Sequence, residues 1–282
     1  MKFTKMHGLG NDYVYVDLSR ERIDDPVGLA RALAPRHTGV GSDGLILIAP
    51  SQVADVRMEM YNADGSRSEM CGNGIRGVAK YAVEHGLVKG LELRIETDSG
   101  IRPAWCTVSG GQVRQVRIDM GKPALNPADL GYRSIDRHRP VPDKLVDHEI
   151  PIGDTTYRFT CVSMGNPHAV VFVEHLHRID LTEEGPRIEH APQFPQRINA
   201  HFARVDARDR VTVRTWERGS GATRACGTGA CAVCVAGVLT GRTARSITAT
   251  LPGGNLDVEW SDDDHVYMTG PAVEVFAGDW PE

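Results

Sequence analysis

The segment 71–83 reads CGNGIRGVAKYAV, and the segment 226–236, which begins 155 positions later, reads CGTGACAVCVA. In the first segment apolar residues recur at positions 75, 78, 79, 82 and 83, which is the spacing of a buried helix face. Gly86 marks the expected end of this helix, and Gly241 marks the end of the second. Both segments therefore predict a helix that begins at a Cys-Gly-x-Gly motif, with the cysteine at or just before the first turn.

The same offset links other parts of the chain. Asn11 and Asn166 are 155 positions apart, and so are Asn62 and Glu217. The turn at residues 99–101 falls on the turn at residues 254–256. Chance similarity of glycine-rich turns is the alternative, but one offset shared by several separated motifs favours a duplication. We therefore expect an α+β fold of two domains related by a pseudo-twofold axis, with equivalent residues facing each other across a cleft.

Strand and domain boundaries follow from the pattern of apolar residues and turns. Strands are expected at 13–17, 45–48, 56–61, 91–97, 102–108 and 113–119, and again at 169–174, 211–217, 246–251, 256–260 and 272–276, with a third helix at 27–34. A segment rich in proline and charge separates the halves. We expect an N-terminal half at 1–121, a linker or surface excursion at 122–148, and a C-terminal half at 149–282.

The composition is that of a globular protein, because 41% of the 282 residues are hydrophobic and 24% are charged. The formal net charge of −5 gives no reason to expect nucleic acid or an anionic membrane as partner, so a small-molecule ligand fits better. The N-terminus contains no apolar signal segment, and no apolar run approaches the length of a membrane span. We expect a cytoplasmic protein whose six cysteines are free thiols.

The position of the two motif cysteines suggests their chemistry. At a helix N-terminus the dipole and the free backbone N–H groups stabilise a thiolate, which lowers the thiol pKa below about 8.5. The glycines that follow Cys71 and Cys226 leave those N–H groups open to a carboxylate. Two such sites facing one another would place a sulfur on either side of one α-carbon. An ionised thiol and a protonated thiol could then invert that carbon in both directions, which predicts a cofactor-independent amino-acid epimerase.

Three other functions use the same residues. Cys226, Cys231 and Cys234 have the C-x4-C-x2-C spacing of a [2Fe–2S] electron-transfer protein, but no cysteine follows to supply the fourth ligand. A zinc site at Cys231 and Cys234 lacks a second ligand pair. A thiol hydrolase with His168 as base leaves the duplicated motif unexplained. We expect Cys231 and Cys234, like Cys106 and Cys161, to be small buried residues.

Polar residues near the strand ends are candidate substrate contacts. His168 lies beside Asn166, which is the repeat partner of Asn11. Glu217 and Arg218 follow a predicted strand, and together they would suit a substrate with both an ammonium and a carboxylate group. A structural histidine and a surface ion pair are the alternatives.

These motifs closely resemble those of the diaminopimelate epimerase family. They are Gly10-Asn11-Asp12, Gly41-Ser42-Asp43-Gly44, Asn62-Ala63-Asp64-Gly65-Ser66, Cys71-Gly72-Asn73-Gly74, Gly165-Asn166-Pro167-His168, Trp216-Glu217-Arg218-Gly219 and Ala225-Cys226-Gly227-Thr228-Gly229. The resemblance implies interconversion of LL- and meso-diaminopimelate without pyridoxal phosphate or metal. It also implies two similar domains, each a mixed sheet wrapped around a central helix, and a homodimer.

The resemblance assigns a role to each matching residue. Cys71 and Cys226 become the acid/base thiols, and His168 and Glu217 become the groups that tune them. The carboxylate cradle and the remaining substrate contacts are Gly72, Asn73, Gly227 and Thr228, and Asn11, Asn62, Asn166, Asn199, Glu217 and Arg218. Some members carry Gln where this chain has Gly44, so one substrate contact is expected to be missing or replaced. A racemase or epimerase of another amino acid is the second candidate.

Overall fold

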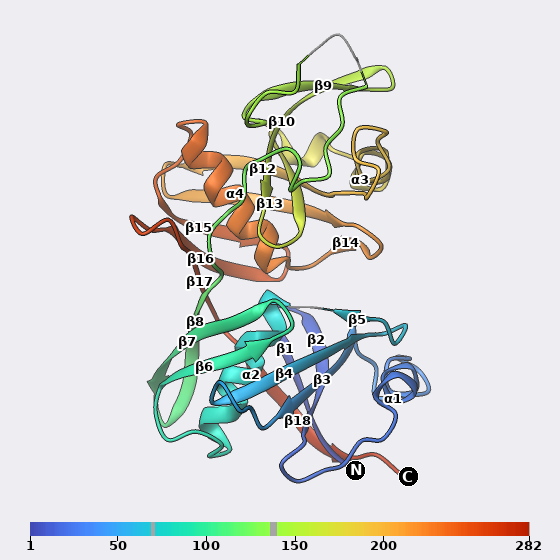
Figure 1. Cartoon of the computed structure of the whole chain (residues 1–282), viewed down its shortest axis with the longest axis vertical. Coiled ribbons are helices and arrows are strands. Elements are labelled where there is room, and N and C mark those ends of the chain that lie inside the picture. The colour runs from blue at the N-terminus through green and yellow to red at the C-terminus, as the bar shows by residue number, and fades with distance from the viewer. Residues whose placement is uncertain (69–70, 136–139, 282) are drawn as a thin grey trace. The chain divides into compact units, whose positions relative to one another are not determined.

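The computed structural model describes residues 1–68, 71–135 and 140–281, which form two compact units (Figure 1). The first unit comprises Met1–Asp119 together with Thr269–Glu282, and the second comprises Met120–Met268. None of the helices in the described ranges has the length and hydropathy that a bilayer crossing requires.

The first unit is a mixed sheet around one buried helix. Its elements are β1 (Lys2–Gly8), β2 (Asn11–Asp17), α1 (Pro26–Leu33), β3 (Gly44–Ala49), β4 (Val56–Asn62), β5 (Arg67–Ser68), α2 (Gly72–Glu84), β6 (Glu92–Thr97), β7 (Gly100–Ser109), β8 (Gln112–Asp119) and β18 (Val273–Asp279). Helix α2 packs against strands that precede it in sequence, including β1 and β2, and against strands that follow it, including β7 and β8. Every α2 residue from Gly72 to Ala82 is buried, so α2 is the centre of the unit.

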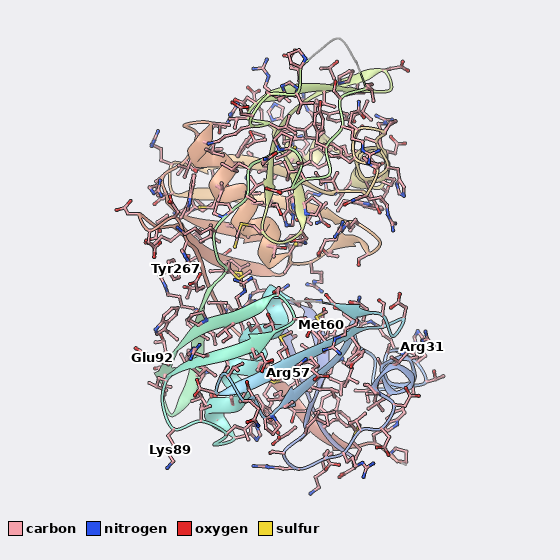
Figure 2. The ribbon with its side chains drawn as sticks, in the orientation of Figure 1. Arg31, Arg57, Met60, Lys89, Glu92 and Tyr267 are labelled. Carbon is pink, nitrogen blue, oxygen red and sulfur yellow. The ribbon has the colours of Figure 1, made fainter. Side chains whose placement is uncertain are left out.

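Helix α1 lies on the outside of the first unit and supports the loop that leads to Cys71. Asp25 caps the helix by accepting a hydrogen bond from the Gly28 N–H, and Pro26 occupies the first helical position. Arg31, labelled in Figure 2, donates from Nε to the Asp64 carbonyl oxygen at 2.7 Å. This contact connects α1 to the turn after β4, the strand that carries the labelled Met60.

The second unit repeats this arrangement. Its elements are β9 (His148–Ile152), β10 (Thr155–Ser163), β11 (Pro167–Phe172), the 3-10 helix η1 (Leu176–Arg178), α3 (Leu181–Glu189), β12 (Asn199–Ala207), β13 (Arg210–Glu217), β14 (Gly221–Thr223), α4 (Gly227–Leu239), β15 (Ser246–Leu251) and β16 (Gly254–Trp260), and β17 (Val266–Gly270) extends across the sequence boundary at Met268. Helix α4 contacts β10, β11, β12, β15 and β16. Cys231 and Cys234 are fully buried on α4, as expected for core residues.

The 155-residue offset is reproduced in the strand pairing. In the first unit β2 and β3 are parallel, with Tyr13 opposite Gly44. In the second unit β11 and β12 are parallel, with His168 opposite Asn199, which are the same two positions of the repeat. Helices α2 and α4 also begin and end at equivalent positions. The expected α+β fold of two similar halves, each with a sheet around a central helix, is confirmed.

The last strand of the chain pairs within the first unit. Strand β18, at the end of the chain, is antiparallel to β1, and Figure 1 shows these red and blue strands side by side. Strand β9, which follows the first half in sequence, is instead antiparallel to β10 in the second unit. The second unit therefore ends at Met268 and not at residue 282, the predicted end of the C-terminal half.

The segment 122–148 differs from the expected linker. It belongs to the second unit, and both Leu130 and Leu145 are buried in the same core cluster as Phe159 and Phe202. Its proline and charge suggested a surface excursion, but the few leucines between them supply enough apolar area to attach the segment to the core.

Candidate active site: two cysteine half-sites

Cys71 is the N-cap residue of α2. Its backbone is extended, with φ −129° and ψ 117°, and its sulfur accepts a hydrogen bond from the Gly74 N–H at 3.3 Å. The side chain is partly exposed. An N-cap position leaves the first N–H groups of the helix without carbonyl partners, so a negative charge is favoured there. The sulfur of Cys71 thus occupies a position that stabilises a thiolate.

Polar side chains from β2 surround the Cys71 sulfur. Asn11 Oδ1 lies 3.5 Å from Sγ, and the Tyr13 hydroxyl donates to Sγ at 3.7 Å. Asn11 is held from the other side because its Nδ2 donates to Asp43 Oδ2 at 2.7 Å. Asn73 Nδ2 donates to Asn11 Oδ1 at 3.2 Å, which links the helix to the strand.

Arg76 lies beneath the first turn of α2. Its side chain is fully buried, and Nη1 donates to the Gly72 carbonyl at 3.0 Å and to Asn73 Oδ1 at 3.1 Å. Its Nε donates to the Pro271 carbonyl at 3.1 Å. These hydrogen bonds fix the Gly72–Asn73 backbone from below, so its N–H groups are held in place for a ligand.

Asn62 is partly buried and is the last residue of β4, opposite Gly44 of β3. Its Nδ2 donates to Ser66 Oγ at 2.9 Å, and its backbone N–H donates to the Ser66 carbonyl at 2.8 Å. These two hydrogen bonds lie within the turn that Asn62 begins. The predicted group Asn11, Cys71, Gly72 and Asn73 is otherwise brought together at the N-terminus of α2.

Cys226 is the N-cap residue of α4 and has nearly the same backbone, with φ −124° and ψ 110°. Its surroundings differ from those of Cys71. The thiol is buried and donates to Glu217 Oε2 at 3.2 Å, and Thr228 Oγ1 lies 3.6 Å from Sγ. The Thr223 hydroxyl donates to the other carboxylate oxygen of Glu217 at 2.6 Å. Burial and the Glu217 carboxylate raise the pKa of Cys226 well above its usual value, so this thiol carries its proton at neutral pH.

His168 is fully buried beside a second histidine. Its Nδ1 lies 2.8 Å from His201 Nε2, and its Nε2 lies 2.9 Å from Asn166 Oδ1. His201 Nδ1 in turn lies 3.0 Å from the Thr215 hydroxyl. Burial, His201 and Arg218 lower the pKa of His168 well below its usual value, and burial lowers the pKa of His201 to about 3. Both imidazoles are therefore neutral at pH 7.

Asn199, at the start of β12, is hydrogen-bonded to Arg218, which follows β13. Asn199 is buried, and its Oδ1 accepts the Arg218 backbone N–H at 3.0 Å while its Nδ2 donates to the Pro167 carbonyl at 2.9 Å. The Arg218 guanidinium is exposed and donates to the Gln196 carbonyl at 3.3 Å. The predicted second-unit residues thus form two connected groups, one at Cys226 and one at His168 and Asn199.

The site contains several residues that sequence reasoning missed. Tyr13 contacts Cys71, and His201 contacts His168. Asp43 accepts a hydrogen bond from Asn11, and Arg76 donates one to Asn73. Tyr13 had a usable signal, since it lies 155 positions before His168. The other contacts depend on which strands become neighbours, and no local pattern records that.

Gly44 begins β3, and its surroundings explain why it is glycine. A Cβ atom there would overlap the Tyr61 carbonyl oxygen and would lie 3.2 Å from the Asn62 Cα. The backbone of this chain therefore leaves no room for a side chain at position 44, which is where some family members carry Gln. A substrate contact at that place would have to come from another residue.

The fold is shared by solved structures of amino-acid epimerases and related proteins. A hydroxyproline epimerase from Agrobacterium vitis superposes with a TM-score of 0.71 over 99% of this chain and 91% of its own, at 18% identity. A probable proline racemase from Agrobacterium radiobacter gives a TM-score of 0.71 at 15% identity, covering 99% of this chain and 92% of its own. The chain thus has the fold of these racemase and epimerase structures.

Sequence comparison gives the family within that class. The family model described as diaminopimelate epimerase matches residues 3–126 and 160–275. Diaminopimelate epimerase of Moorella thermoacetica is 50% identical over 100% of this chain and 99% of its own, and that of Acetivibrio thermocellus is 48% identical over 99% and 98%. The chain belongs to the diaminopimelate epimerase family, so the predicted family is confirmed.

Proposed function

We propose that this enzyme interconverts LL- and meso-diaminopimelate, with Cys71 and Cys226 as the two acid/base groups and with no cofactor. The observation that carries the proposal is the placement of each cysteine as the N-cap of its own helix in a duplicated fold. Family membership supports the substrate, because relatives about half identical over their full length are named for it. The reaction requires both sulfurs to reach one α-carbon from opposite faces.

The two thiols begin the reaction in different states. The Cys226 thiol is protonated because it is buried and hydrogen-bonded to the Glu217 carboxylate. The Cys71 sulfur accepts hydrogen bonds from the Gly74 N–H and the Tyr13 hydroxyl, and when protonated it donates to Asn11 Oδ1. Because it lies at the helix N-terminus and Asn11 is neutral, we assign ionisation to Cys71. In this state the Cys71 thiolate removes the α-proton from one face, and the Cys226 thiol delivers its own proton to the other. The reverse reaction begins with the protonation states exchanged.

Helix N-termini supply the electrostatic stabilisation that a carbanion needs. When the α-proton leaves, negative charge moves from the α-carbon into the adjacent carboxylate. The backbone N–H groups of Gly72 and Asn73, and of Gly227 and Thr228, are placed at the first turns of α2 and α4 to receive that charge. The flanking glycines keep side chains away from these groups, so the carboxylate can approach the backbone closely.

The far end of the substrate carries a second ammonium and a second carboxylate. Arg218 is exposed and can pair with that carboxylate, and its backbone is held by Asn199. The amide groups of Asn62 and Asn166 supply further donors and acceptors, while Asn11 and Glu217 lie beside the two sulfurs and contact the reacting end. Because Gly44 adds no side chain, the contact that Gln would make elsewhere in the family falls to these residues.

A racemisation assay tests the substrate directly. LL-diaminopimelate would be compared with L-proline, L-glutamate and L-lysine under reducing conditions. The proposal predicts that only diaminopimelate is epimerised at a significant rate. A faster reaction with proline would favour the other candidate, a racemase of another amino acid, which the shared fold with proline racemase also permits.

We also propose that the enzyme works as a homodimer in the cytoplasm. The dimer follows from the family resemblance, and the compartment from the need to keep six free cysteines reduced. Light scattering after size-exclusion chromatography tests the dimer, and a monomer mass at micromolar concentration would exclude it.

A further inference from the structure

Tyr13 is placed beside Cys71 by the packing of β2 against β3. Its side chain is 4% exposed, and it lies opposite Gly44 in the parallel pairing of the two strands. A Cβ atom at position 44 would lie 3.1 Å from the Tyr13 ring, so the ring packs directly against the Gly44 backbone. The ring therefore has a fixed position, and its hydroxyl points at the N-terminus of α2.

The hydrogen-bond network gives the direction of the hydroxyl proton. Asn11 Nδ2 donates to Asp43 Oδ2 at 2.7 Å, and an ionised carboxylate only accepts, so the amide orientation of Asn11 is set by that contact. The same Nδ2 lies 3.4 Å from the Tyr13 oxygen and donates to it. The Tyr13 hydrogen is then free to be donated to Cys71 Sγ, at an O···S distance of 3.7 Å.

Tyr13 remains a donor over the working pH range. Burial and the neighbouring Cys71 raise the pKa of Tyr13 well above its usual value, so the phenol does not ionise near neutral pH. A buried tyrosine hydroxyl also needs a partner, because an unsatisfied one is costly. The Cys71 sulfur is that partner, and a thiolate accepts a hydrogen bond more strongly than a thiol does.

We propose that Tyr13 is a catalytic residue that favours the Cys71 thiolate by donating a hydrogen bond to its sulfur. The proposal rests on the role of Cys71 as an acid/base group in the proposed function. The repeat adds to the argument, because the position equivalent to Tyr13 is His168, whose ring contacts Asn166 and His201. The tyrosine donor is thus a feature of the first half-site, whereas the hydroxyl beside Cys226 is that of Thr228 on α4.

Other charged and titratable groups also face this part of α2. Arg76 lies one turn into the helix, Tyr15 on β2 donates to the Gly74 carbonyl at 3.0 Å, and Asp43 acts through Asn11. A Tyr13→Phe substitution leaves all of these groups in place and keeps the ring that packs against Gly44. Asn11 keeps its shorter hydrogen bond to Asp43. The substitution therefore removes the O–H···S contact with little other change.

The test measures the pKa of Cys71 without any turnover. In a Cys226→Ala background, the rate of iodoacetamide alkylation at Cys71 would be followed against pH by peptide mass spectrometry. The remaining cysteines are 0% to 7% exposed, so they react slowly. Tyr13→Phe should raise the pH midpoint of Cys71 by about 0.5 to 1 unit, which slows alkylation about 3- to 10-fold on the acid side.

Two further variants complete the test. Tyr13→Leu, which also lacks the hydroxyl, should shift the midpoint in the same direction, while Tyr61→Phe in the same unit should leave it unchanged. Circular dichroism would verify the fold of each variant. An unchanged or lowered midpoint in a folded Tyr13→Phe protein would overturn the proposal. Because the assay needs no substrate, failure of the wild-type enzyme to epimerise diaminopimelate would count against the proposed function alone.

Discussion

The two helix N-termini that carry Cys71 and Cys226 have the same backbone and different surroundings. The Cys71 sulfur accepts hydrogen bonds from Gly74 and Tyr13 and donates to the neutral amide oxygen of Asn11, whereas the buried Cys226 thiol donates to the Glu217 carboxylate. Position 62, the repeat partner of Glu217, carries a neutral asparagine. The comparison teaches that the duplicated scaffold places the sulfur, while a few substituted neighbours determine whether it is ionised.

Removal of either sulfur gives the largest expected effect. Cys71→Ala and Cys226→Ala should each lower kcat/KM for epimerisation by at least about 10³-fold, because each direction needs both an acid and a base. Chiral chromatography of the product measures this. Cys231→Ala, a change on the same helix as Cys226, should stay close to wild type. Activity within tenfold of wild type in either site mutant would mean that the two half-sites do not act as a pair.

Acid should distinguish the two units. The buried His168 and His201 have pKa values below the unfolded value of about 6.5, so the unfolded chain binds more protons as the pH falls from there. Above about pH 6.5 the two histidines are neutral in both states, so they do not make the free energy of unfolding depend on pH. Below that pH each histidine lowers the free energy of unfolding, by about 1 to 2 kcal/mol at about pH 5.

Hydrogen exchange corrected for intrinsic rates would detect this loss. Protection should fall more in the second unit than in the first, whose histidines lie outside its core. His201→Gln should reduce the difference between the units. Equal loss of protection in both units at about pH 5 would contradict the assignment of the acid sensitivity to the histidine pair.

Replacing the carboxylate beside Cys226 should make the two half-sites more alike. Because the Glu217 carboxylate raises the pKa of Cys226, Glu217→Gln should lower it, and the thiol would lose its proton at a lower pH. The basic limb of the kcat/KM profile should move down by about 1 unit, and kcat should fall about 10- to 100-fold. Glu183→Gln, on the exposed side of α3, is the matched control. A basic limb that stays in place would remove Glu217 from this role.

The second glycine of each Cys-Gly-x-Gly motif, Gly74 or Gly229, provides the smallest contrast. A Cβ at Gly74 would meet the terminal methyl group of Ile46, which can rotate away, whereas a Cβ at Gly229 would overlap the His201 ring. His201 is fixed by His168 and Thr215. Gly229→Ala should therefore cost about 1 to 2 kcal/mol more than Gly74→Ala in urea unfolding. Equal costs would show that the His201 ring is free to move.

Much of the fold could be predicted from local patterns. The apolar spacing after each Cys-Gly-x-Gly motif predicted α2 and α4, and the constant offset predicted the duplication. Strand β1 was missed because Lys5, a charged residue in its sequence KFTKMHG, is buried inside the unit and breaks the expected apolar pattern. Its charge is paired with Asp12. Helix α3 was missed because Gly185 and Pro186 interrupt its pattern. The pairing of β18 with β1 is non-local, so sequence order assigned β18 to the wrong unit.

The candidate site was predictable where the motifs carry the chemistry. Cys71, Asn73, Cys226 and Thr228 lie at the helix starts that the glycines indicated. Asp43 and Arg76 act through hydrogen bonds to those residues, and nothing in their own sequence context indicates this. Tyr13 could have been found by applying the repeat offset to His168.

The most direct test of the two-thiol account is the early turnover of LL-diaminopimelate in D2O. Because a thiolate can accept only one proton, the Cys71 sulfur can return only the hydrogen that it removed from the substrate, while Cys226 delivers solvent deuterium to the product. Mass spectrometry and NMR should therefore find one deuterium, at the inverted α-carbon, in the meso product and none in the remaining LL substrate. Equal labelling of substrate and product, or an unlabelled product, would contradict two separate acid/base groups on opposite faces of the α-carbon.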